Sequence, residues 1–109
     1  MTRNDDPATL DRMFDTLSHP LRRRVLMFAY RNATRDDGLP VERIEIEGDD
    51  VEQLANELHH IHLPKLDDGG YIEWDRDSNS IRRGPAFDDV ESLLRLMDDN
   101  QDELLEEWL

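Results

Sequence analysis

The densest group of side chains able to hold a metal is a set of three histidines, His59, His60 and His62. Imidazole nitrogens are common metal ligands, and a helical pair of them lies at positions i and i+4, one turn apart. Offsets of one, two and three residues do not match that spacing, and His19 is far away in the sequence. We therefore expect no metal site and no cofactor.

Residue patterns that carry catalysis are also missing from the sequence. It has no glycine-rich phosphate loop, no Gly-x-Ser-x-Gly and no metal-hydrolase motif. The absence of cysteine removes disulfides, thiolate metal sites and thiol nucleophiles together. Carboxylates are so frequent in this sequence that a pair of them does not indicate a catalytic site. We expect no catalytic residues, and a protein that is not an enzyme.

The charges are unevenly distributed along the chain. Residues 20–35 contain five arginines and no acidic residue, whereas residues 88–109 contain nine acidic residues and only Arg95 as a base. Such asymmetry indicates that different faces of the molecule have different roles. The arginine-rich part supplies candidates for phosphate contacts, which provide position and most of the non-specific affinity in DNA binding.

The overall composition is acidic, but the apolar residues recur with the periodicity of a folded core. The 109 residues include 27 acidic and 13 basic ones, which gives a formal net charge of −14, and Lys65 is the only lysine. This length predicts one domain. An acidic, lysine-poor chain is typical of proteins from salt-in halophiles, in which an acidic total does not argue against nucleic-acid binding. The alternatives are an acidic interaction protein or a nucleic-acid mimic.

The sequence shows no signal for a membrane or for export. No apolar run approaches the 18 residues or so that a spanning helix needs. The first residues are polar and lack the apolar core of a signal peptide. We expect a soluble, cytoplasmic protein with no membrane partner.

Apolar periodicity predicts two helices at the start of the chain. Thr9 or Asp11 would cap the first, which ends near Ser18 because Pro20 disfavours helical geometry in the residue before it. The second covers residues 20–32 and has a wide apolar stripe, which suits a central helix. A loop then precedes a strand over residues 41–47, where isoleucines alternate with charged residues.

The rest of the chain predicts a helix, a hairpin and a last helix. Asp49 or Asp50 caps the third helix, which turns Leu54, Leu58, Ile61 and Leu66 inward, is kinked or split by Pro64, and ends at Gly69 and Gly70. Residues 71–75 and 80–84 form a hairpin that joins residues 42–46 in a three-stranded sheet. Residues 87–109 form a final acidic amphipathic helix.

This order is helix-helix-strand-helix-strand-strand-helix, an α+β winged helix-turn-helix layout. Residues 17–26, LSHPLRRRVL, resemble the opening of ArsR-type winged-helix regulators, and residues 62–73, HLPKLDDGGYIE, are similar to the end of their recognition helix and the start of their wing. Residues 59–66, HHIHLPKL, carry a variant of that recognition-helix pattern, which resembles small winged-helix domains of haloarchaea. The resemblance covers about residues 10–84.

The sequence departs from the family at one place. The family usually has two short helices between its second helix and the wing, and here only residues 49–68 are available. The first of those helices is missing, shortened or fused into one long helix. We divide the chain into a flexible tail at 1–9, a DNA-binding domain at 10–86 and a dimerisation helix at 87–109.

The DNA-contacting residues follow from that assignment. Asn and Gln pair with adenine, and His and Lys reach guanine acceptors or phosphates. The candidates for base edges are Gln53, Asn56, His59, His60, His62 and Lys65. The candidates for phosphate and wing contacts are Arg22, Arg23, Arg24, Arg76, Arg82 and Arg83. For each of Arg22, Arg23 and Arg24, pairing with a carboxylate is an equally open alternative.

The first and last helices are expected to form a homodimer. The last helix has an apolar seam at alternating spacings of four and three, which is typical of a coiled coil. The interface candidates are Leu10, Met13, Phe14, Leu17, Val90, Leu94, Met97, Leu104 and Trp108. The expected function is therefore sequence-specific binding of double-stranded DNA by a homodimeric transcriptional regulator of a halophilic archaeon. The alternative is a winged-helix protein-interaction module, or an acidic mimic, that does not bind DNA.

Overall fold

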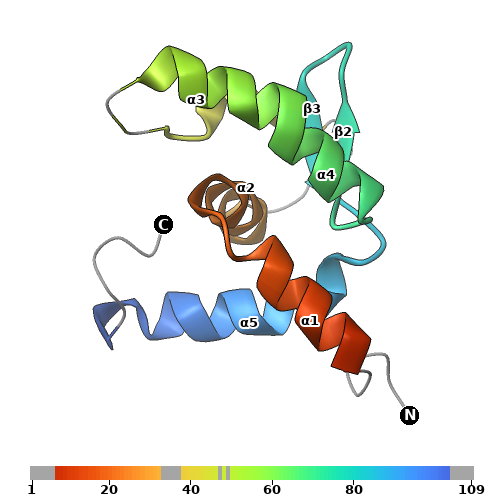
Figure 1. The fold of residues 1–109 in the computed structure, drawn as a ribbon, viewed down its shortest axis with the longest axis vertical. Coiled ribbons are helices and arrows are strands. Elements are labelled where there is room, and N and C mark those ends of the chain that lie inside the picture. The colour runs from red at the N-terminus through yellow and green to blue at the C-terminus, as the bar shows by residue number, and fades with distance from the viewer. Residues whose placement is uncertain (1–6, 33–37, 47, 49, 104–109) are drawn as a thin grey trace.

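The computed structural model describes residues 7–32, 38–46, 48 and 50–103, which form a mixed α+β fold with a three-stranded antiparallel sheet (Figure 1). The predicted order of helices and strands is confirmed over these residues. Their bounds are α1 Pro7–Thr16, α2 Pro20–Arg31, β1 Leu39–Pro40, η2 Val41–Arg43, α3 Val51–Glu57, η3 Leu58–His62, α4 Leu63–Asp68, β2 Ile72–Asp75, β3 Ser80–Arg83, α5 Phe87–Asp99 and η4 Gln101–Glu103.

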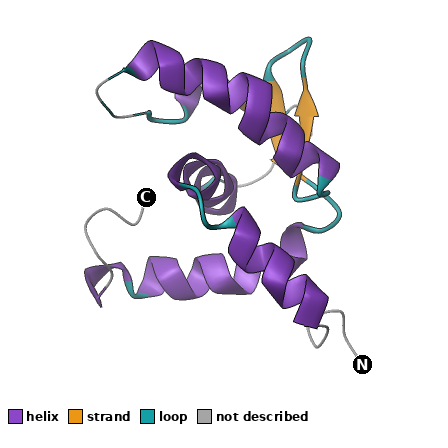
Figure 2. Cartoon of the chain, in the orientation of Figure 1, coloured by secondary structure: helices purple, strands orange, loops and turns teal. Residues whose placement is uncertain are grey.

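The central position of α2 is confirmed. Figure 2 shows it between the run formed by α3, η3 and α4 on one side and the α1 and α5 pair on the other. Val25, Leu26 and Ala29 on this helix have no exposed surface. They join Ile72, Ile81, Phe87, Val90 and Leu94 in one core, so the arginine-rich segment is held by packing on several sides.

The junction between α1 and α2 lies where the sequence places it. His19 caps α2 by accepting a hydrogen bond from the Leu21 N–H at Nδ1 (3.1 Å), and Pro20 takes the first helical position, where no donor is needed. The expected start of α1 is wrong, because the helix begins at Pro7 and not after a cap at Thr9 or Asp11. Residues 7–9 therefore belong to α1 and not to the tail, and residues 1–6 lie outside the described residues.

The expected strand at residues 41–47 is wrong, although the three-stranded sheet exists. Its order is β1-β3-β2, with Leu39 opposite Ile81 and Trp74 opposite Ile81 on the other side. Val41–Arg43 is a 3₁₀ turn closed by the Ile44 N–H to the Val41 carbonyl (3.0 Å). The turn buries Val41 and Ile44, three residues apart, and this spacing does not fit the alternation of a strand.

Residues 51–68 form one helical run, so the segment before the hairpin is not split into two separate helices. The predicted cap at Asp50 is confirmed by its side chain, which accepts from the Gln53 N–H at 3.0 Å. The run ends as expected at Gly69 and Gly70, where Gly70 adopts a φ of 81°.

Pro64 does not break the run, because the π-helical segment η3 lies directly before it. In η3 the Leu63 N–H donates to the Leu58 carbonyl, five residues back. Pro64 has no N–H and would clash with the carbonyl four residues before it in an α-helix, and the wider π turn moves that carbonyl. The extra residue also rotates the following side chains. Ile61, expected inward, is 53% exposed, whereas His62 is 3% exposed.

The final helix is shorter than expected. α5 ends at Asp99, Asn100 caps it, and a 3₁₀ turn follows at Gln101–Glu103. The single helix predicted for residues 87–109 is therefore wrong at residues 100–103, and residues 104–109 lie outside the described residues. The Arg31 guanidinium on α2 donates to the Asp98 carboxylate on α5 at 2.7 and 3.0 Å, which joins the two helices.

Candidate nucleic-acid interface

The 51–68 run presents a row of polar side chains to solvent. Gln53, Asn56, His60 and Lys65 are exposed, as the DNA prediction requires. His59 is half-buried: its ring Nδ1–H donates to the Ala55 carbonyl at 2.9 Å, and its edge approaches the Trp74 ring. An Asn, a Gln, a Lys and two imidazoles along one helix supply the donors and acceptors that read base edges.

His62 does not belong to that row. Because η3 shifts the register, its ring lies in the interior, and its Nδ1 accepts from the Arg22 guanidinium at 3.3 Å. The ring also contacts the His19 ring, with 4.1 Å between the ring centroids and 40° between the ring planes. The expectation that His62 contacts a base edge is therefore wrong, since a buried side chain does not reach a groove.

The hairpin exposes two arginines, and one of them, Arg76, lines the same hollow as Lys65 of the 51–68 run. Arg76 lies over the Trp74 ring at 4.8 Å from its centroid, and Arg82 is exposed on β3. The Trp74 indole N–H donates to the Asn79 side chain at 3.2 Å, which holds the aromatic ring against the turn. Asn79 has a φ of 51°, so the turn uses the left-handed region that asparagine tolerates. Arg76 and Arg82 keep their guanidinium groups at the surface.

Arg83 lies on β3 as expected, but the expectation that it contacts phosphate is wrong. Its guanidinium donates to the carbonyls of Ala29 and Tyr30 at 3.1 and 3.0 Å, pairs with Glu91 at 3.3 Å, and lies over the Phe87 ring. Side chains alternate across a strand, so neighbouring Arg82 and Arg83 point to opposite faces. Arg83 binds the last carbonyls of α2 and joins that helix to α5.

Arg22 is likewise a structural residue and not a phosphate contact. It is 7% exposed, and it donates to the Thr16 carbonyl (2.8 Å), the Asp15 carbonyl (2.9 Å) and the Ser18 hydroxyl (3.3 Å) as well as to His62. Arg23 donates to the Leu17 carbonyl at 2.7 Å. Arg24 is half-buried and has interaction partners. The first two arginines thus satisfy the carbonyl end of α1.

A hollow of about 550 Å³ lies between α4 and the hairpin. Its lining includes Lys65, Arg76 and the Trp74 ring together with Asp67 and Asp68. The Asp67 carboxylate accepts from the Trp74 backbone N–H at 3.2 Å, and Lys65 pairs with Asp15 at 3.4 Å. Both partners of that ion pair are exposed, so the pair contributes little and leaves Lys65 free to exchange partners.

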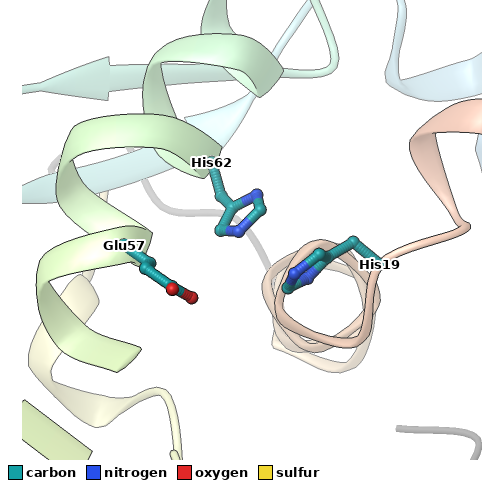
Figure 3. Close-up of side chains that lie close together, drawn as sticks. All are labelled: His19, Glu57 and His62. Carbon is teal, nitrogen blue, oxygen red and sulfur yellow. The ribbon is translucent and has the colours of Figure 1, made fainter. Parts of the chain in front are cut away.

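Three residues that the sequence did not connect meet on the other side of the 51–68 run. Each of His19, Glu57 and His62 offers one ligand atom, and these atoms lie within 4.8 Å of one another (Figure 3). Burial lowers the pKa of His62 to about 4 and that of His19 below its usual value, with the positive charge of Arg22 acting in the same direction. The expectation of no metal ligands rested on the spacing of His59, His60 and His62, and it set His19 aside because His19 is far away in the sequence.

The expected dimer seam is largely used within the chain itself. Met13, Leu17, Val90 and Leu94 are buried in the core, so they are not available to a second subunit. Met97 is half-buried, and Leu104 and Trp108 lie outside the described residues. Leu10 and Phe14 on α1 are 42% and 56% exposed, and Leu96 on α5 is 59% exposed.

Comparison with known proteins identifies the family. A family model described as a domain of unknown function, DUF7344, matches residues 14–82, more than half of the chain. The chain belongs to the DUF7344 family. The matched part runs from α1 to β3. It therefore includes the whole 51–68 run, the turn of the hairpin and the cluster of His19, Glu57 and His62. No curated protein and no solved structure matches the chain. Among the described residues, every helix is too short or too polar to cross a bilayer.

Proposed function

We propose that this protein binds double-stranded DNA sequence-specifically, as a homodimeric transcriptional regulator with an ArsR-like winged-helix fold. The 51–68 run enters the major groove, and the β2–β3 hairpin is the wing. The acidic, lysine-poor composition supports an origin in a halophilic archaeon, where molar salt screens the carboxylates.

The observation that carries this proposal is the adjacency of the polar row and a hairpin that exposes Arg76 and Arg82. Gln53, Asn56, His60 and Lys65 line the solvent side of a run of 18 residues, about 27 Å long at 1.5 Å per residue. A major groove about 12 Å wide accommodates such a helix. α4 packs directly on β2, and Arg76 lines the same hollow as Lys65, so the hairpin turn lies where a neighbouring phosphate or minor groove would pass. Arg82 adds a second exposed guanidinium on β3.

A second candidate is supported by the acidic side chains around the same surface. Glu52, Asp67, Asp68, Glu73 and Asp75 are all exposed on the 51–68 run and β2. A surface of this charge repels phosphate at low ionic strength and suits a basic protein partner. This is the protein-interaction module of the alternative hypothesis, and a test of duplex binding separates the two.

Replacing both hairpin arginines is expected to weaken duplex binding to a similar extent for all sequences. In Arg76→Ala with Arg82→Ala, two phosphate contacts are lost, so the slope of log K against log salt should fall by about 2. Replacing Gln53, His60 or Lys65 should instead change the preferred sequence. The measurement is selection from a randomised duplex library, followed by fluorescence anisotropy at several KCl concentrations.

The matched control is Arg12→Ala, which removes an exposed arginine from α1, on a different element. It should leave duplex affinity and salt slope unchanged. If the wild-type protein enriches no duplex in the selection, or if Arg12→Ala weakens binding as much as the hairpin variant, the DNA proposal is wrong and the protein-interaction module takes its place.

The homodimer is expected to use the exposed apolar side chains of α1 and α5. Phe14→Asp with Leu96→Asp removes two of them and adds charge, so the double variant should be a monomer in molar KCl while the wild type is a dimer. Light scattering at tens of micromolar protein measures this. High salt is required because the acids of α5 repel a neighbouring copy. A wild-type monomer mass under these conditions contradicts the dimer.

A further inference from the structure

The cluster formed by His19, Glu57 and His62 joins two parts of the fold that are remote in sequence. His19 is the cap of α2, Glu57 ends α3 and His62 ends η3. Figure 3 shows the Glu57 carboxylate and the two rings turned toward one another across the space between α2 and the 51–68 run. One ligand atom from each lies within 4.8 Å of the others. Tetrahedral zinc holds its ligand atoms about 3.4 Å apart, so a modest closure is needed.

The π-helical segment brings the side chains of Glu57 and His62 to the same side of the helical run. An offset of five residues in an α-helix separates two side chains by about 140° around the axis. In η3 the turn is wider, and residues five apart are joined by the i to i−5 hydrogen bonding seen between Leu63 and Leu58. Glu57 and His62 therefore point to the same side, toward His19.

The chemical state of the three groups suits a metal ion. Burial, followed by neighbouring positive charge, lowers the pKa of both histidines, so no proton charge on the rings opposes a metal ion near pH 7. Glu57 supplies the negative charge. The cations that face the cluster are Arg22, Arg23 and Lys65, and they oppose a metal.

The hydrogen bonds of the rings define the coordinating atoms. Nδ1 of His19 accepts from the Leu21 N–H, and Nδ1 of His62 accepts from Arg22, which has only donors. Nε2 is left for a metal on each ring. Coordination there moves the ring proton to Nδ1, so both hydrogen bonds must be given up. This cost and the nearby cations weaken the binding of a metal ion at this site.

We infer that His19, Glu57 and His62 form a binding site for one divalent transition-metal ion of the Zn²⁺ type. Two imidazoles and one carboxylate leave a fourth position for water, which is the ligand set of an open zinc site. The ion would join the start of α2 to the 51–68 run. This inference does not depend on the proposed DNA contact, because none of the three residues belongs to the exposed polar row.

The test uses Co²⁺ as the probe, because its visible absorption reports nitrogen and oxygen coordination, and Zn²⁺ as the competitor. The full-length protein should bind one equivalent of Co²⁺, and Zn²⁺ should displace it. Glu57→Gln keeps the shape of the side chain and removes its charge, and His19→Asn keeps a residue that caps α2 well. Each should weaken binding at least about tenfold while circular dichroism stays unchanged.

The matched control is His60→Asn, which removes an exposed imidazole from the same π segment, outside the cluster. It should bind Co²⁺ as the wild type does. The site is refuted if the wild-type protein shows no cobalt absorption at near-millimolar Co²⁺. It is also refuted if His60→Asn weakens binding as much as His19→Asn, or if Glu57→Gln and His19→Asn both bind normally.

Discussion

Arg22→Met is expected to lower the free energy of unfolding by about 3 kcal/mol. The methionine keeps the length of the apolar stem but removes the donors that Arg22 gives to Thr16, Asp15, Ser18 and His62. Hydrogen bonds that involve a charged group contribute about 1.5–3 kcal/mol each, and bonds that share one side chain are not additive. The carbonyl end of α1 and the buried imidazole would both lose their partner.

Chemical denaturation followed by circular dichroism measures this loss. Arg22→Lys should be intermediate, because an ammonium keeps the charge but does not reproduce the planar fork that reaches two carbonyls. Arg82→Met is the matched control: Arg82 is exposed on β3, so its loss should change stability by less than about 0.5 kcal/mol. A loss below about 1 kcal/mol in Arg22→Met would show that the hydrogen bonds of the guanidinium do not stabilise the packing of α1, α2 and η3.

Acidification of the metal-free protein is expected to remove about 3 kcal/mol of stability through His62. Burial, then the charges of His19 and Arg22, lower its pKa in the folded protein from 6.5 to about 4, and Glu57 opposes them. The folded state therefore binds the proton less readily than the unfolded chain. The contribution is complete above pH 6.5 and is lost as the pH falls toward 4. His19, with its lowered pKa, acts in the same direction.

The measurement is denaturant unfolding at fixed ionic strength over this pH range, with a chelator present. His62→Gln cannot take up the proton, so its stability should depend much less on pH than that of the wild type, whatever its value at neutral pH. His60→Asn should keep the wild-type slope, because His60 is exposed. Equal slopes for the wild type and His62→Gln would contradict the assignment.

Several features follow from the sequence because residues close together in the chain create them. Pro20 cannot continue α1 and is well placed to start α2, so the junction at residues 18–20 is local. Asp50 caps its own helix three residues on, and Gly70 permits the φ of 81° that ends it. The order of helices and strands, the hairpin turn and the exposure of Gln53 and Asn56 rest on the same kind of short-range information.

Other features depend on partners tens of residues away, and only the tertiary structure decided them. The two-residue strand β1 exists because β3 pairs with it, and Arg83 turns inward because the end of α2 offers it two carbonyls. The π segment η3 exchanges Ile61 for His62 at the buried face and so brings His62 to Arg22 and His19. The helical periodicity that the sequence displays assumes 3.6 residues per turn throughout. One wider turn, stabilised by contacts with α2, breaks that assumption and determines which histidine faces solvent and which faces the cluster.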